Sequence, residues 1–242
     1  MDKDRILRLV EIANQKYPPI IMIEGVSGVG KSFLIKEIQN AFPSKNIKVQ
    51  HNPSDSNLAM KLISWTKYNQ LHLTPFTLTC FYLIGQYEIM ENLNKSHYTS
   101  NKDDLFILDR SVFISGFIYQ GYNGGLGFEA CEKSLELLTN AMQYFFKIDE
   151  IFLLTGEPSL IAERRKNAQK KEYKVDNIFF DEESIFLEQE CYIDFAKKIH
   201  NLNKNFPEPK FFDVSKENEK KDLIENIEQI FTHREEILNR YY

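Results

Sequence analysis

Residues 20–32 read IIMIEGVSGVGKS and are the most informative segment of the chain. Its first four residues are apolar, and three of them are β-branched isoleucines, which favour a buried strand. Gly25, Gly28 and Gly30 then interrupt the apolar run, and residues 33–42 have the period of a helix. The stretch therefore predicts a strand, a glycine-rich loop and a helix in succession.

The loop fits the pattern of a phosphate-binding loop, Gly25-x-x-x-x-Gly30-Lys31-Ser32. Glycines let the chain turn tightly and point N–H groups at an anion, and the start of the helix adds the positive end of its dipole. We expect Lys31 to contact the β- and γ-phosphates of ATP and the Ser32 hydroxyl to hold Mg²⁺. A glycine-rich turn that carries a lysine by chance does not account for the strand and helix around it. The predicted ATP-binding residues of the loop are Gly25, Ser27, Gly28, Val29, Gly30, Lys31 and Ser32.

The composition is that of an ordinary globular protein. The chain has 242 residues, of which 43% are hydrophobic and 27% charged, enough for one large α/β domain or two small ones. A net charge of -5 argues against a protein dedicated to nucleic acids or membrane surfaces, because those depend on an excess of Lys and Arg. The sequence carries neither a signal-peptide pattern nor an apolar run of membrane-spanning length.

Cysteines and histidines are scattered along the chain. Cys80, Cys131 and Cys191 show no metal-ligand spacing, so we expect reduced core thiols in a cytoplasmic protein. The five histidines, His51 included, are expected to be structural or surface residues. The sequence therefore predicts no metal cluster built from these two residue types.

Apolar runs alternate with helical periods along the rest of the chain. Further strands are predicted at residues 47–50, 105–108, 151–154 and 210–214. Helices are predicted at residues 58–68, 76–93, 129–146, 186–199 and 223–238, after an N-terminal helical extension at residues 1–18. This alternation predicts an α/β fold, a three-layer sandwich in which a parallel five-stranded sheet has helices on both faces. No linker divides the chain, so residues 1–242 are expected to form a single domain.

The strand at residues 105–108 ends in Asp109-Arg110-Ser111. An aspartate at the tip of a buried strand in a phosphate-loop protein commonly acts on the metal, and Arg110 can reach a phosphate with its fork of donors. A surface ion pair that ends the strand is the alternative. The polar turn after the second strand contains Asp55, and it should face the same cleft because parallel strands end at one edge of the sheet.

One segment is markedly basic in an otherwise acidic chain. Its cationic residues are Arg164, Arg165, Lys166, Lys170, Lys171 and Lys174. One interpretation is a solvated helix face. The other is a source of positive charge for a phosphoryl group in transfer, where positioning and charge stabilisation do most of the work. The residues alone favour neither interpretation.

The order of these segments resembles the thymidylate kinase family, within the nucleoside and nucleoside-monophosphate kinases. The phosphate-binding loop carries part of the resemblance, and Leu108-Asp109-Arg110 and Tyr119-Gln120-Gly121 carry more, followed by the glycine-rich residues 124–127. Residues 162–165 resemble the start of the family's lid, and residues 212–216 resemble its loop near the adenine. The resemblance covers residues 19–231.

The resemblance implies transfer of a phosphoryl group from ATP, with Mg²⁺, to a pyrimidine deoxynucleoside monophosphate such as dTMP. The catalytic residues would be Lys31, Arg110 and Arg165, and Arg164 would stack on the adenine. Ser32 and Asp109 would hold the metal. The lid would span residues 163–182, and the protein would be a homodimer. The implied acceptor-binding residues are Asp55, Tyr82, Gln86, Asp109, Arg110 and Gln120, of which Tyr82 would stack on the base.

Arginines that the family uses to bind the acceptor are missing. Residues 52–55 contain none, Gln86 stands where the family has one, and none lies near Gly124. Each lost charge-assisted hydrogen bond would weaken binding of a monophosphate by about 1.5–3 kcal/mol.

Two other functions therefore stay open. Gln86 with Asp109-Arg110-Ser111 also resembles the deoxynucleoside kinases, in which Asp55 would be the nearest carboxylate to accept the proton of a 5′-hydroxyl. A nucleotide-binding protein without transferase activity is the third possibility. The segment Tyr119-Gln120-Gly121 favours the nucleotide kinase.

Overall fold

The computed structural model describes residues 18–51, 58–69, 81, 88, 104–111, 114–115, 148–169, 181–202 and 206–241. Of the N-terminal extension expected at residues 1–18, only Pro18 is described, and the helix expected at residues 129–146 lies outside this part of the chain. Of the helix expected at residues 76–93, only Phe81 and Glu88 are described, and both are helical. Among the described helices, none has the length and apolar character that crossing a bilayer requires.

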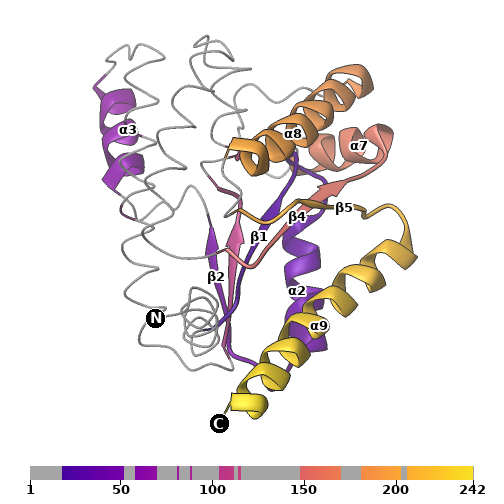
Figure 1. Ribbon diagram of the computed structural model, residues 1–242. Coiled ribbons are helices and arrows are strands. Elements are labelled where there is room, and N and C mark those ends of the chain that lie inside the picture. Colours follow the sequence, from indigo (N-terminus) through magenta and orange to yellow (C-terminus); the bar gives the residue numbers. More distant parts are fainter. Residues whose placement is uncertain are drawn as a thin grey trace.

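Five strands form one parallel sheet (Figure 1). They are β1 (Ile20–Glu24), β2 (Ile47–His51), β3 (Leu105–Asp109), β4 (Glu150–Thr155) and β5 (Lys210–Asp213). Their order across the sheet is β2-β3-β1-β4-β5, and every neighbouring pair is parallel. The predicted α/β fold with a parallel five-stranded sheet is confirmed, and the predicted strands end within one residue of the observed bounds.

Helices cover both sides of the sheet. They are α2 (Lys31–Ala41), α3 (Leu58–Tyr68), α7 (Pro158–Gln169), α8 (Glu182–Leu202) and α9 (Glu217–Tyr241). In Figure 1, α2 and α9 lie together on one side of the sheet and α3 lies on the other. The pair α7 and α8 lies near the carboxyl ends of the strands. Helices on both faces make the predicted three-layer sandwich.

The observed start of α8 differs from the predicted start, because a local contact at the helix end determines it. Helix α8 begins at Glu182, four residues before the predicted start. The Asp181 side chain caps it by accepting a hydrogen bond from the Ser184 N–H at 2.8 Å. Glu182 and Glu183 in its first turn face the positive end of the helix dipole. These polar residues lie outside the apolar period, so the period alone placed the start too late.

Helices α7 and α9 show the same effect. Helix α9 begins at Glu217 and runs to Tyr241, beyond the predicted residues 223–238 at both ends. For α7 the sequence indicates a basic segment, with a helix face as one interpretation and no predicted bounds, and the helix starts at Pro158. Proline suits the first turn of a helix, because its missing N–H has no partner there.

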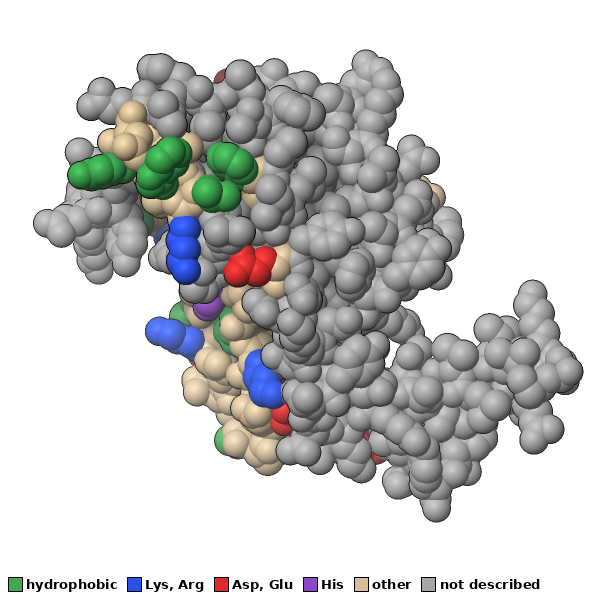
Figure 2. All heavy atoms as spheres, turned by 90° about the vertical axis from the view of Figure 1, so that its left-hand side faces the viewer, with side chains coloured by type: hydrophobic (Ala, Val, Ile, Leu, Met, Phe, Trp, Pro, Cys, Tyr) green, Lys and Arg blue, Asp and Glu red, His purple; other side chains and the backbone are tan. Residues whose placement is uncertain are grey.

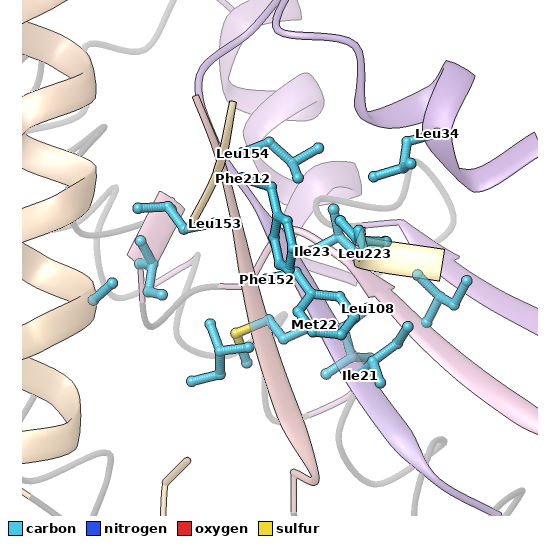
Figure 3. Close-up of a cluster of buried hydrophobic side chains, with 14 of the residues drawn as sticks. Ile21, Met22, Ile23, Leu34, Leu108, Phe152, Leu153, Leu154, Phe212 and Leu223 are labelled. Atoms are coloured by element: carbon cyan, nitrogen blue, oxygen red, sulfur yellow. The ribbon is translucent and has the colours of Figure 1, made fainter. Parts of the chain in front are cut away.

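The core lies between the sheet and the helices that pack on it, among them α2, α9 and α8. All residues of β1 and β3 are buried, which is typical of central parallel strands. Figure 3 shows Leu34 of α2 and Leu223 of α9 pointing into the same cluster as Ile23. On β4 and β5, Phe152 and Phe212 meet edge to face with ring centroids 5.5 Å apart. Burial of each such side chain contributes roughly 1.5–3 kcal/mol, so the strands that carry the loop are firmly held.

Helix α3 exposes aromatic side chains. Trp65 is 57% exposed and Tyr68 is 87% exposed. Figure 2 shows hydrophobic side chains gathered on the face of the molecule to which α3 belongs.

The register of β1 and β3 positions the candidate site. Ile23 pairs with Asp109, and the N–H of Arg110 donates to the Ile23 carbonyl at 2.9 Å. The loop that starts at Gly25 and the turn that starts at Arg110 therefore leave the sheet side by side. The crevice beyond the carboxyl ends of parallel strands is where ligands bind in open α/β sheets.

Candidate active site

The loop between β1 and α2 has the backbone conformation of an anion cradle. Gly25 has a φ of 139° and Gly28 has a φ of 84°, values that residues with a side chain rarely adopt. A Cβ on Gly25 would lie 2.6 Å from the carbonyl oxygen of Leu154. Helix α2 starts directly after Gly30 and, within the described part of the chain, has no side-chain cap on its first N–H groups. These N–H groups can therefore donate hydrogen bonds to a bound anion.

Lys31 is buried beneath this loop. Its Nζ donates to the carbonyl oxygens of Gly25 at 2.6 Å and Val26 at 2.9 Å. Burial lowers the pKa of Lys31 well below its usual value, and the charge of Arg110 lowers it further. The amine thus lies inside the loop, bound to carbonyls that phosphate oxygens can replace as stronger, charged acceptors.

Asp109 ends β3 with one oxygen bound and one oxygen unbound. Its Oδ2 lies 2.8 Å from Nδ1 of His51, the last residue of β2. Its Oδ1 is buried and has no hydrogen-bond partner among the residues that the structure describes. A buried acceptor without a partner costs about 1–3 kcal/mol, so this oxygen suits a cation or a donor brought by a ligand.

The oxygen atoms of Asp109 and Ser32 are suitable ligands for Mg²⁺. The ion prefers carboxylate and hydroxyl oxygens and keeps several waters, and the unpartnered oxygen of Asp109 supplies such a carboxylate. Ser32 follows Lys31 in the first turn of α2 and is exposed, so its hydroxyl is accessible. His51 is therefore more than an isolated surface histidine. The register of β2 and β3 brings it opposite Asp109, a pairing that the sequence indicates only once these two strands are known to be neighbours.

Arg110 has an unusual backbone. Among the residues that the structure describes, Arg110 is the non-glycine residue with a positive φ, which is 69°. The left-handed conformation costs about 1–2 kcal/mol for such a residue, and it persists where the surroundings hold it. Such strain is concentrated at functional sites. Arg110 therefore stands beside the phosphate-binding loop in a fixed conformation, at the edge where the sequence predicts the acceptor.

Glu24 is a buried acid at the base of the loop. Its side chain is fully buried, and it accepts hydrogen bonds from the hydroxyls of Ser111 and Ser115. The Tyr192 hydroxyl of α8 donates in turn to Ser115 at 3.1 Å. Burial raises the pKa of Glu24 to about 7, although the two serine bonds and the charge of Lys31 lower it.

Sequence reasoning did not select Glu24. The signal available was a single acid at the end of an apolar run, directly before Gly25. A carboxylate in that position must be satisfied in the interior, because burial of an unpaired charge is costly.

Both arginines of α7 contact the phosphate-binding loop. Arg164 donates through Nη1 to the carbonyl of Val29 at 2.8 Å, and Arg165 donates through Nε to the carbonyl of Ser27 at 2.7 Å. Arg165 also pairs with Glu188 of α8 at 2.8 Å. The basic segment is helical here, but the buried Arg165 is no part of a solvated face. The lysines expected to continue it, at residues 170, 171 and 174, lie outside the described residues.

The structure thus brings the predicted donor-side residues together around one loop, with Asp109 and Arg110 on the neighbouring strand. Four predicted acceptor-site residues lie outside the described part of the chain. They are Asp55, Tyr82, Gln86 and Gln120.

The chain matches the model of the thymidylate kinase family over residues 23–227. This chain belongs to the thymidylate kinase family. The family match covers the phosphate-binding loop, Asp109, Arg110 and both arginines of α7.

Individual family members are more distant. The thymidylate kinase of Pelodictyon phaeoclathratiforme is 27% identical over 148 residues, which are 60% of this chain and 65% of that protein. The thymidylate kinase of Mycoplasma genitalium is 31% identical over 130 residues, which are 52% of this chain and 60% of that protein. The chain therefore matches less than two thirds of the length of these relatives.

A solved structure agrees on the fold. The thymidylate kinase of Candida albicans superposes with a TM-score of 0.58 at 16% sequence identity, covering 91% of this chain and 94% of that one. At this level of identity the match concerns the fold, which is that of a phosphate-loop kinase.

Proposed function

We propose that this member of the thymidylate kinase family transfers a phosphoryl group from ATP to a pyrimidine deoxynucleoside monophosphate, with dTMP as the first candidate. The observation that carries the proposal is the juxtaposition of a loop that encloses the amine of Lys31 with the unpartnered oxygen of Asp109. Phosphoryl transfer needs positive charge and positioned donors around the phosphates, and little covalent chemistry from the protein.

On the donor side, the loop N–H groups and Lys31 bind the β- and γ-phosphates. Lys31 exchanges the carbonyls of Gly25 and Val26 for phosphate oxygens, which are stronger acceptors because they are charged. Arg164 is exposed beside the loop and is free to stack on the adenine after it releases Val29.

Arg165 is proposed to contact the transferred phosphoryl group. It reaches that group by releasing the Ser27 carbonyl and its ion pair with Glu188. The lid that carries it would span residues 163–182.

Ser32 and Asp109 are the proposed ligands of Mg²⁺. When bound, the ion neutralises charge that develops on the phosphate oxygens. The Asp109 side chain is oriented for this role by His51, which occupies its other oxygen.

On the acceptor side, Arg110 binds the monophosphate with its planar group of donors. Asp55, Gln86 and Gln120 are proposed to contact the sugar and base, and Tyr82 is proposed to stack on the base. A phosphate held by Arg110 next to the loop would lie close to the γ-phosphate, since both flank the ends of β1 and β3.

A deoxynucleoside kinase is the second candidate. The unpartnered Asp109 Oδ1 favours it, because that oxygen can accept the proton of a 5′-hydroxyl. The paired oxygen, held by His51, keeps the carboxylate oriented for such a transfer.

A panel of acceptors separates the candidates. Purified protein with ATP and Mg²⁺ is assayed for ADP release in the presence of dTMP, dCMP, dAMP, dGMP and the corresponding nucleosides. The proposal expects dTMP to stimulate ADP release most. Stimulation by thymidine or deoxycytidine alone would identify a nucleoside kinase. Binding of ATP without stimulation by any acceptor would identify a nucleotide-binding protein without transferase activity.

We further propose a single domain over residues 1–242 and a cytoplasmic homodimer. The exposed Trp65 and Tyr68 of α3 support a contact between two copies, because large apolar side chains at a surface mark interaction sites. Light scattering after size-exclusion chromatography should give twice the mass of the 28.5 kDa chain. A monomer across micromolar concentrations would contradict the dimer without affecting the proposed reaction.

A further inference from the structure

Glu24 connects two segments that both line the candidate site. It is the last residue of β1, directly before Gly25 of the phosphate-binding loop. Its Oε1 accepts from Ser111 and its Oε2 accepts from Ser115, at 2.5 Å for the second bond. Both serines belong to the segment after β3. The carboxylate therefore joins the start of the loop to the residues that follow Arg110.

This connection fixes Arg110 from both sides. Before it, the main-chain N–H of Arg110 is bound to Ile23 of β1. After it, the hydroxyl of Ser111 is bound to Glu24, the next residue of β1. The Ser111 oxygen also accepts the N–H of Ile114 at 3.2 Å, which holds the turn closed. The left-handed φ of 69° at Arg110 thus lies between two attachments to one strand.

Glu24 also lies near two cationic side chains of the site. Lys31 and Arg110 are the cations whose charges act on the buried carboxylate. Above its pKa of about 7, where Glu24 is ionised, its negative charge balances these two cations. Tyr192 completes the arrangement from α8, through its bond to Ser115.

We propose that Glu24 is a positioning residue that holds Ser111, and through it Arg110, in the orientation that binds the phosphate of the acceptor. This inference rests on the proposed monophosphate kinase function. It assigns to β1 a role on the acceptor side, whereas the loop that follows β1 serves the donor side.

Kinetics of a double-mutant cycle test the inference. Glu24→Gln keeps the shape of the side chain, but its amide NH₂ cannot accept a bond, so one serine loses its acceptor. We expect kcat/KM for the acceptor to fall at least 10-fold while KM for ATP changes less than 3-fold. In an Arg110→Ala background the same substitution should cost less than 3-fold, because Glu24 acts through Arg110.

Two results would overturn the inference. One is a loss of similar size for both substrates, which would make Glu24 a general support of the phosphate-binding loop. The other is an undiminished loss in the Arg110→Ala background. If Glu24→Gln does not fold, Ser111→Ala removes the same connection at its other end, and about a 5-fold loss specific to the acceptor is expected. An equal effect of Ser111→Ala on both substrates would again exclude the role.

A control variant and a structural readout complete the design. Glu150→Gln removes a carboxylate that pairs with Lys210 at 3.0 Å, at the opposite end of the sheet, and should leave both KM values unchanged. A crystal structure of Glu24→Gln tests the positioning without any assay. We expect the Arg110 backbone or guanidinium to shift relative to the wild type. An unmoved Arg110 would overturn the inference, and this result does not depend on whether the wild-type protein phosphorylates a monophosphate. An inactive wild type with a shifted Arg110 would instead reject the proposed function alone.

Discussion

Arg165 of α7 and Glu188 of α8 form an ion pair with 2.8 Å between Nη2 and Oε2. The arginine side chain is 2% exposed and the carboxylate 21%. The same guanidinium donates to the Ser27 carbonyl, so the pair sets the distance between α8 and the phosphate-binding loop. A contact between two helices thereby reaches the site where the phosphates are proposed to bind.

Glu188→Gln should destabilise the protein by about 2 kcal/mol, because it removes the ionised acceptor from the ion pair with the buried Arg165. For a chain of this size this loss corresponds to a fall in Tm of about 4–8 °C. Thermal unfolding followed by circular dichroism measures it. Replacing both partners by apolar residues, in Arg165→Met with Glu188→Leu, should recover most of the loss, and an unchanged Tm for Glu188→Gln would mean that solvent compensates the charge.

Lys31→Ala should lower kcat at least 100-fold, because one positioned donor to the transferring phosphate is lost. Steady-state ADP release with dTMP measures this effect. Lys36→Ala, on the exposed side of the same helix, is the matched control and should retain full activity. Retained activity in Lys31→Ala would remove the lysine from the site.

His51→Ala should weaken Mg²⁺ binding about 10-fold, because residues that orient a metal ligand are worth about that much. Titration of Mn²⁺ followed by electron paramagnetic resonance measures binding independently of activity. His51→Asn keeps a side-chain N–H donor and should show a smaller effect. Equal affinity in all three proteins would leave His51 without a role at Asp109.

Gly25→Ala should destabilise the protein by more than about 1 kcal/mol, because φ is 139° and the new Cβ would lie 2.6 Å from the Leu154 carbonyl oxygen. Urea unfolding gives the free energy of unfolding. Gly156→Ala is the matched control, since the nearest contact of its Cβ would be 3.7 Å away, at Ile161. A comparable loss in both variants would contradict the steric argument.

The stability of the protein should depend on pH through Glu24. Its pKa is about 7 in the folded protein against 4.5 ordinarily, so the folded state binds this proton more tightly than the unfolded chain. The associated stability is fully present below pH 4.5 and is lost as pH rises through 7, with a total on the order of 3 kcal/mol. Urea unfolding at pH 5 and pH 8 measures it. The free energy of unfolding of the wild type should fall relative to that of Glu24→Gln, and parallel pH curves would refute the assignment.

The sheet and the loop could be predicted because their signals are local. β1 and β3 are apolar runs that each end at an acidic residue, Glu24 or Asp109, and such runs are typical of buried parallel strands. Helix ends were less predictable. Asp181 extends α8 through a capping bond that the apolar period does not contain.

The site was predictable where a motif is contiguous and was missed where tertiary pairing makes it. Glu24 and Ser115 lie 91 positions apart, and His51 and Asp109 lie 58 positions apart. Spacing along the chain carries no information on such pairs until the strand order is known. With the order β2-β3-β1, His51 and Glu24 flank the strand that carries Asp109.

The carbonyls of the phosphate-binding loop have a consequence for the protein between turnovers. Lys31, Arg164 and Arg165 each donate to main-chain oxygens within residues 25–29. These three side chains therefore hold the loop in its observed conformation from within the protein. On the proposed function, an arriving nucleotide would exchange these main-chain oxygens for its own phosphate oxygens, which are charged and therefore stronger acceptors.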